Sequence, residues 1–88
     1  MNVVFTEPFR KDYKKLSTGV QKSLGKALKF LITNPRHPSL RSKKIPATSI
    51  WYARLSKAYR FTFQFENDSV ILRRVGTHDI LKQERKID

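Results

Sequence analysis

Apolar side chains in the first third of the chain form one short run and then recur every three or four positions. Residues 2–6 contain two valines and a phenylalanine and predict a strand. Thr6 can cap a following helix, because Glu7 and Pro8 both suit the unsatisfied amides of a first helical turn. We expect this helix to bury one apolar face, formed by Phe9, Tyr13 and Leu16.

A second helix is predicted after Ser17-Thr18-Gly19, which breaks the first helix and can cap the next. It should end before Asn34-Pro35, since a proline disfavours helical conformation in the residue that precedes it. Two short helices with a tight connection then form an antiparallel hairpin. The apolar stripe of the second helix consists of Val20, Leu24, Ala27, Leu28 and Leu31.

In the second half of the chain the pattern changes to an alternation of period two, which is typical of strands. The two faces of the middle strand differ, because one holds four aromatic rings and the other is polar. We expect the aromatic face to pack against the helices and the polar face to meet solvent or a substrate. The aromatic face consists of Tyr59, Phe61, Phe63 and Phe65, and the polar face includes Arg60, Thr62 and Gln64.

These patterns predict a single α+β domain over residues 1–88, a length that leaves room for one core. A helical hairpin should pack on an antiparallel-rich four-stranded sheet, followed by a short C-terminal helix. Residues 34–48 are predicted to form a basic, proline-rich loop, which is either a functional element or a solvated connector. The remaining strands are predicted over residues 50–55, 59–66 and 69–75, and the terminal helix over 80–85.

Charge narrows the range of partners. The chain has 19 Lys plus Arg against 7 Asp plus Glu, a net charge of +12, so we expect it to attract polyanions. It has no cysteine, which excludes disulfides, thiol catalysis and cysteine-based zinc sites. No apolar run approaches the roughly 18 residues of a membrane helix, and the N-terminus lacks a secretory signal pattern. We therefore expect a cytoplasmic protein without metal, cofactor or membrane partner.

The chain also contains the groups that cleave RNA without a metal. In that reaction the ribose 2′-hydroxyl attacks the adjacent phosphate, which leaves a 2′,3′-cyclic phosphate and a free 5′-hydroxyl. A base takes the 2′-hydroxyl proton, cations stabilise the phosphorane, and an acid protonates the leaving oxygen. Arginine forks match two phosphate oxygens, and His37 and His78 are the only histidines. His78 follows a predicted strand end, four residues after Arg74.

Five segments carry a family signature: His37–Arg41 (HPSLR), Lys43–Ile45 (KKI), Ile50–Leu55 (IWYARL), Tyr59–Phe63 (YRFTF) and Val70–Asp79 (VILRRVGTHD). In their order and spacing they resemble the RelE/ParE family of toxins from toxin–antitoxin modules. The resemblance covers nearly the whole chain and agrees with the element order predicted from periodicity.

This resemblance implies roles for individual residues. The family contains mRNA interferases, most of which cut messages in the ribosomal decoding site, and gyrase inhibitors, which are not nucleases. The Arg-x-Gly-x-His ending resembles that of YafQ-like interferases, in which the histidine takes part in proton transfer. The implied catalytic residues are Arg60, Arg74 and His78, and the implied RNA-binding residues are His37, Arg41, Lys43, Lys44 and Arg54.

One position departs from the family pattern. Many relatives have a glutamate, a candidate general base, where this chain has Tyr52. Either His37 or Asp79 then acts as the base, or the rate comes mainly from positioning and charge, or activity is weak or absent. Asp79 can orient His78, although we expect it to cap the terminal helix.

The resemblance and the residues together predict an endoribonuclease toxin that acts on ribosome-bound mRNA and is neutralised by an acidic antitoxin protein. Two alternatives remain open. One is a ParE-like inhibitor of DNA gyrase, and the other is a non-enzymatic, basic nucleic-acid-binding module.

Overall fold

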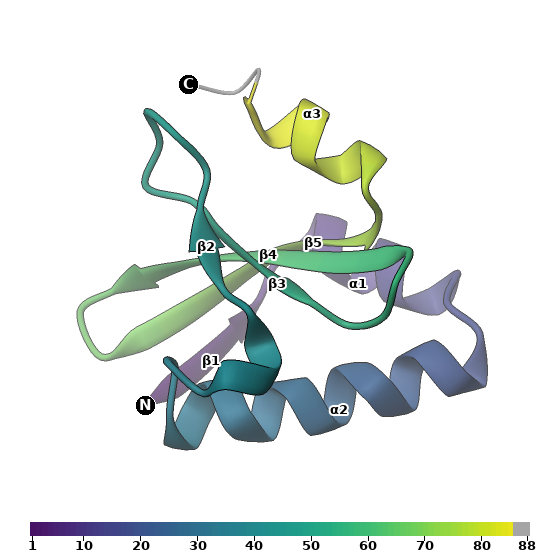
Figure 1. The fold of residues 1–88 in the computed structure, drawn as a ribbon, viewed down its shortest axis with the longest axis horizontal. Helices are drawn as coiled ribbons and strands as arrows, with labels where there is room; N and C mark the ends of the chain where they lie inside the picture. Colours follow the sequence, from purple (N-terminus) through teal and green to yellow (C-terminus); the bar gives the residue numbers. More distant parts are fainter. Residues whose placement is uncertain (86–88) are drawn as a thin grey trace.

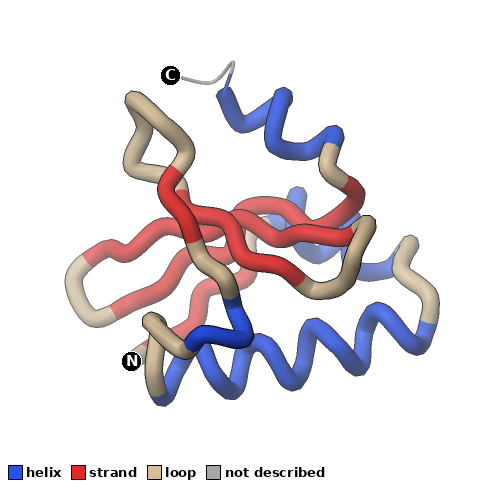
Figure 2. The backbone as a smooth tube through the Cα atoms, viewed as in Figure 1, coloured by secondary structure: helices blue, strands red, loops and turns tan. Residues whose placement is uncertain are grey.

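A five-stranded sheet forms the centre of the protein (Figures 1 and 2). It is seen in a computed structural model that describes residues 1–85. The strands are β1 (Asn2–Phe5), β2 (Lys43–Lys44), β3 (Trp51–Arg54), β4 (Tyr59–Glu66) and β5 (Ser69–Thr77). Their order is β1-β5-β4-β3-β2, in which β1 pairs with β5 in parallel and all other neighbours are antiparallel.

The helices begin where the sequence predicts. The Thr6 hydroxyl accepts the Phe9 N–H at 3.3 Å, and the Ser17 hydroxyl accepts the Val20 N–H at 3.3 Å. The helices are α1 (Glu7–Lys14), α2 (Thr18–Thr33) and α3 (Asp79–Arg85), with a 3₁₀ turn, η1 (Pro38–Leu40). None of the helices within residues 1–85 is long and apolar enough to cross a membrane. The predicted α+β order of one strand, two helices, further strands and a terminal helix is confirmed.

The α1–α2 hairpin covers one face of the sheet, and α3 lies over the other (Figure 1). Phe9 of α1 and Leu24 and Leu31 of α2 share a buried cluster with Phe61 and Phe63 of β4. Burying one such side chain contributes about 1.5 to 3 kcal/mol relative to leaving it exposed. The middle of the aromatic face is therefore core, as its alternation predicts.

The ends of that face and its polar side differ from the sequence-based expectation. Phe65 keeps 42% of its surface exposed, while Thr62, expected to face solvent or substrate, is 0% exposed. The Thr62 hydroxyl accepts the Arg74 N–H at 3.0 Å, beside a register shift between β4 and β5. The sequence predicts the terminal helix, but local alternation cannot show that α3 folds back over this side of the sheet (Figure 1).

The segment predicted as a loop over residues 34–48 contains both η1 and β2, so the sheet has five strands rather than four. β2 is only Lys43–Lys44, which is too short to show any alternation. Its geometry comes from pairing with Tyr52 and Trp51 of β3, a contact that lies outside local sequence.

Helix α3 is held on the sheet by two buried side chains. Ile80 is 6% exposed and sits over Gly76, while Glu84 is 1% exposed. The Glu84 carboxylate accepts from Arg73 Nε at 2.6 Å, and Arg73 Nη1 donates to Gln64 Oε1 at 2.7 Å. A carboxylate so deeply buried is tolerated because it is paired. The contacts fix α3 and with it the corner that joins β5 to α3.

Arg74 makes a second set of contacts that joins three elements. Its Nε donates to Asp12 Oδ2 at 2.6 Å and its Nη2 to Asp12 Oδ1 at 3.1 Å, while Nη1 donates to Gln83 Oε1 at 2.8 Å. The same Asp12 carboxylate also accepts the Val75 N–H at 3.1 Å. Arg74 therefore ties α1 and α3 to β5.

We expect Gly76→Ala to loosen α3. A Cβ at this position would lie 3.0 Å from Ile80 Cγ2, so Ile80 must shift, at a cost of about 1 kcal/mol in the free energy of unfolding. Urea unfolding and hydrogen exchange of the α3 amides measure the effect. The matched control is Gly25→Ala in α2, where nothing lies within 4 Å and alanine should stabilise by roughly 0.5 to 1 kcal/mol. Equal stabilisation by both substitutions would contradict the close packing of α3.

Asp12→Asn should lower the free energy of unfolding by about 1 to 3 kcal/mol, because Arg74 loses a charged, two-pronged hydrogen-bond partner. Urea unfolding at neutral pH gives the value. Asp68→Asn serves as control, since Asp68 is exposed in the β4–β5 turn and its substitution should change stability by no more than about 0.5 kcal/mol. If the two variants unfold alike, the Asp12–Arg74 contact does not hold the fold together.

Candidate functional site

The outer face of β3 and β4 carries a pair of arginines. Arg54 and Arg60 are direct cross-strand partners, and both are half-buried. Like charges placed opposite each other destabilise a sheet, which makes the pair a costly arrangement unless an anion joins it. Burial, and then the charge of Arg54, lowers the pKa of Arg60 from its ordinary value. This pair is the centre of what we call the cationic face, defined by Arg41, Lys43, Tyr52, Arg54 and Arg60.

The guanidinium of Arg60 is oriented by the turn between β3 and β4. Its Nη1 donates to the carbonyl oxygens of Ser56 at 2.6 Å, Tyr59 at 2.9 Å and Lys57 at 3.3 Å. Within residues 1–85, Arg60 Nε and Nη2 have no protein acceptor. The fork is therefore fixed at one nitrogen and keeps two for a ligand, an arrangement suited to a phosphate.

His78 lies at the same end of the sheet. Gly76 pairs with Arg60, and Thr77 pairs with Tyr59. His78 is therefore the first residue after the paired part of β5. Its carbonyl accepts the Leu81 N–H at 3.0 Å and starts α3, while the residue itself is exposed. The structure thus brings His78 and the arginine pair to one end of the β3–β4–β5 sheet.

Asp79 is the first residue of α3 rather than the residue before it. A negative charge in a first helical turn is favourable there. Its position next to His78 leaves the three roles considered from the sequence as predictions: the general base, orienting His78, and stabilising the helix start.

Arg74 is not brought to the cationic face. Each of its three guanidinium nitrogens already donates to a side-chain oxygen of Asp12 or Gln83. The hydrogen bond to Asp12 raises the pKa of Arg74 above its ordinary value. Three of the five N–H donors of Arg74 are engaged in this way, so that Arg74 links α1 and α3.

Tyr52 enters the site in a way that sequence reasoning did not recognise. It pairs with Lys43 on one side and Thr62 on the other, and its charge interaction with Arg60 acts on the pKa of that arginine. The family resemblance marks it only as the position where many relatives have a glutamate. The alternation of the strand, which puts Tyr52 and Arg54 on one side, is the signal that identifies it.

The basic segment before β3 divides into two groups. His37 stacks on Phe30 with ring centroids 4.0 Å apart, and its Nδ1 accepts the Ser39 N–H at 3.1 Å, so its ring supports η1. Arg41 has a left-handed backbone with φ of 46° and lies close enough to Arg60 to lower its pKa. Lys43 and Lys44 are exposed on the edge strand. Arg41 and Lys43 thus extend the cationic face, whereas His37 does not.

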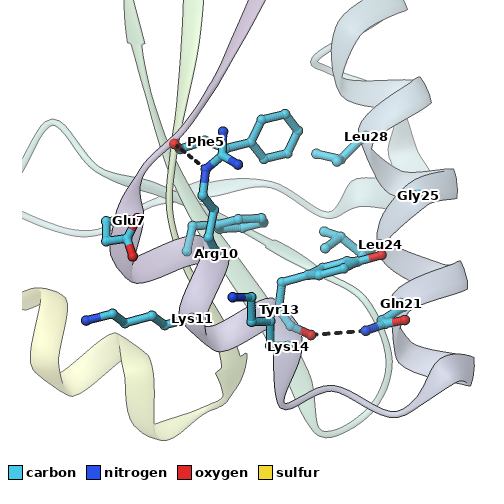
Figure 3. Close-up of a pocket in the computed structure, with 11 residues that line it drawn as sticks. Phe5, Glu7, Arg10, Lys11, Tyr13, Lys14, Gln21, Leu24, Gly25 and Leu28 are labelled. Carbon is cyan, nitrogen blue, oxygen red and sulfur yellow. Dashed lines mark hydrogen bonds between the residues drawn. The ribbon is translucent and has the colours of Figure 1, made fainter.

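A separate groove of about 520 Å³ runs between α1 and α2 (Figure 3). Its apolar lining includes Phe5 and Tyr13, which are 42% and 40% exposed, although Tyr13 was expected on a packed face. Gln21 closes one end by donating to the Tyr13 carbonyl at 3.1 Å. The charged lining consists of three cations, Arg10, Lys11 and Lys14, and one acidic residue, Glu7. The groove therefore combines an exposed apolar surface with positive charge.

No group of three histidine or acidic side chains within residues 1–85 is arranged to hold a metal ion.

Comparison with known proteins supports the fold. No protein-family model and no curated protein sequence matches the chain. Solved structures do match it, among them the intact RelBE toxin–antitoxin complex of E. coli, with a TM-score of 0.71 and 25% identity over 86% of this chain and 94% of that chain.

Two further toxin structures resemble the chain over most of their length. The YoeB/ParE toxin from Agrobacterium tumefaciens has a TM-score of 0.75 and 14% identity, covering 89% of this chain and 99% of that chain. YafQ from E. coli strain BL21(DE3) has a TM-score of 0.71 and 18% identity, covering 91% and 96%. The chain therefore has the fold of the RelE/ParE superfamily of toxins, as its sequence motifs predict.

Proposed function

We propose that this chain is the toxin of a toxin–antitoxin module and cleaves mRNA on the ribosome by attack of a 2′-hydroxyl, without a metal. The observation that carries the proposal is the meeting of Arg54, Arg60 and His78 at one end of the sheet. The net charge of +12 supports a polyanionic substrate. The fold shared with RelE- and YafQ-type toxins favours the same class of activity.

In the proposed reaction the scissile phosphate lies on the free nitrogens of Arg60. Arg60 and Arg54 stabilise the charge that grows on the phosphorane oxygens, which is the largest electrostatic demand of the step. His78, on the exposed corner, donates a proton to the 5′ oxygen as the bond to phosphorus breaks. Asp79 is adjacent and is the better candidate to accept the 2′-hydroxyl proton, because the ring of His37 is held against Phe30.

The proposed protein partner is an acidic antitoxin. The E. coli RelBE structure is a complex of a toxin with its antitoxin, and this chain has the same fold. A segment with an apolar side and acidic neighbours would fit the groove between α1 and α2, with its carboxylates near Arg10, Lys11 and Lys14 (Figure 3).

We expect His78→Ala and Arg60→Ala to abolish cleavage of translated mRNA and to relieve growth arrest. Removing a general acid costs roughly 10²- to 10⁴-fold in rate, and removing a transition-state cation roughly 10²- to 10³-fold. Induction of each variant in cells, followed by primer extension on an abundant message, measures the cuts. Lys22→Ala, at an exposed position of α2 outside the α1–α2 groove and the cationic face, should cut as the unaltered chain does.

A gyrase-cleavage assay runs in parallel. DNA breaks with intact mRNA, unaffected by His78→Ala, would place the protein among the gyrase inhibitors. Absence of both growth arrest and nucleic-acid damage would favour a plain nucleic-acid-binding module.

Arg54→Ala should weaken RNA binding and reduce its dependence on salt. Each phosphate contact on a single strand contributes about 0.7 to the slope of log K against log salt concentration, so the slope should fall by about that amount. Polarisation of a labelled single-stranded RNA, titrated with the His78→Ala chain over a series of KCl concentrations, gives the slope. Adding Lys22→Ala to the same parent is the control, and an equal fall in both variants would show that Arg54 has no special contact.

A further inference from the structure

A second pocket, of about 550 Å³, lies where β3 begins and β4 ends, on the side of the sheet that the helices cover. Its aromatic walls are Trp51 and Phe65, whose ring centroids are 6.4 Å apart at 68°, and its floor is Phe63. The helices bury Phe63 to 1% exposure but leave Phe65 at 42%. We call this the aromatic pocket.

The other wall of the aromatic pocket is basic and rigid. It consists of the segment 35–42, in which Pro35 and Pro38 restrict the backbone and Arg36 and Arg41 supply positive charge. The side chains around the pocket include no acidic residue. Exposed aromatic rings beside arginines form the combination that holds single-stranded nucleic acid, since every base has a face that can stack.

Arg41 connects the aromatic pocket with the cationic face. It lines the pocket, and its charge also acts on Arg60. Along β3 the distance from Trp51 to Arg54 is three residues, or about 10 Å. The two side chains lie on opposite faces of the sheet, so a single strand that joins them would pass around the β2 edge, where Lys43 and Lys44 are exposed.

We propose that the aromatic pocket binds one unpaired nucleotide of the RNA, with its base against Trp51 and Phe65 and its phosphate on Arg41. This inference rests on the proposed function for the identity of the ligand. The pocket selects single-stranded over duplex RNA, because a base in a duplex is stacked on its neighbours and cannot enter. It reads no sequence, because ring stacking accepts any base.

Trp51 is the only tryptophan of the chain, so its fluorescence reports on this pocket directly. The test titrates the His78→Ala chain, which should leave RNA intact, with a short single-stranded RNA and with a duplex of the same sequence. The single strand is expected to quench Trp51 saturably, and the duplex to quench it far less. Phe65→Leu should raise the apparent Kd for the single strand about tenfold.

Two further variants separate stacking from folding. Phe65→Tyr retains a ring and should keep the original Kd, while Ile32→Ala removes an equally exposed apolar side chain from α2 and should also leave the Kd unchanged. Urea unfolding of each variant shows that it is folded under the binding conditions.

The proposal is overturned if polarisation detects RNA binding while Trp51 emission stays constant. It is also overturned if Phe65→Leu binds as tightly as Phe65→Tyr, or if polyglutamate rather than RNA quenches Trp51, which would make the pocket a site for an acidic protein. Single-strand-specific quenching without any mRNA cleavage by the unaltered chain would support the pocket and contradict the nuclease function. Cleavage of mRNA with no change in Trp51 emission would support the nuclease function and contradict the pocket.

Discussion

Two consecutive arginines of β5 join this strand to the two helices that flank it, α1 and α3. Beside the register shift between β4 and β5, Arg73 reaches α3 and Arg74 reaches α1. Each is paired with one of only seven acidic side chains in a chain of net charge +12. Self-repulsion in so basic a protein opposes compactness. Pairing β5 with the carboxylates of Asp12 and Glu84 offsets part of that repulsion where α1, α3 and β5 meet. Within residues 1–85, Arg54 of β3 and Arg60 of β4 have no such acidic partner.

The parts of the fold that depend on residues close together in the chain could be predicted from the sequence. The caps at Thr6 and Ser17 and the helix end before Pro35 depend on residues within a turn of each other, and the structure confirms them. β2 could not be predicted, because two residues carry no periodicity and its pairing partner lies in β3. Alternation does not predict the burial of Thr62, whose hydroxyl accepts the Arg74 N–H beside the register shift between β4 and β5.

The candidate site, too, could be predicted from the sequence only where it depends on nearby residues. The pairing of Arg54 with Arg60 could be predicted, because the two strands are joined by a short hairpin turn that fixes their register. The role of Arg74 could not be read from its motif, because the carboxylate that engages it is 62 residues away in the chain. The aromatic alternation of β4 correctly indicated a core face, but where the covering helices end, and hence the exposure of Phe65, depends on packing between elements.

Because β1 pairs with β5, the sheet cannot be completed until β5 has been translated. Asn2 is translated 67 residues before its partner Ser69. At about 5 to 20 residues per second, this strand waits roughly 3 to 13 seconds for its neighbour. The corner at His78 is made later still. The site therefore cannot assemble before the segment through His78 has been translated.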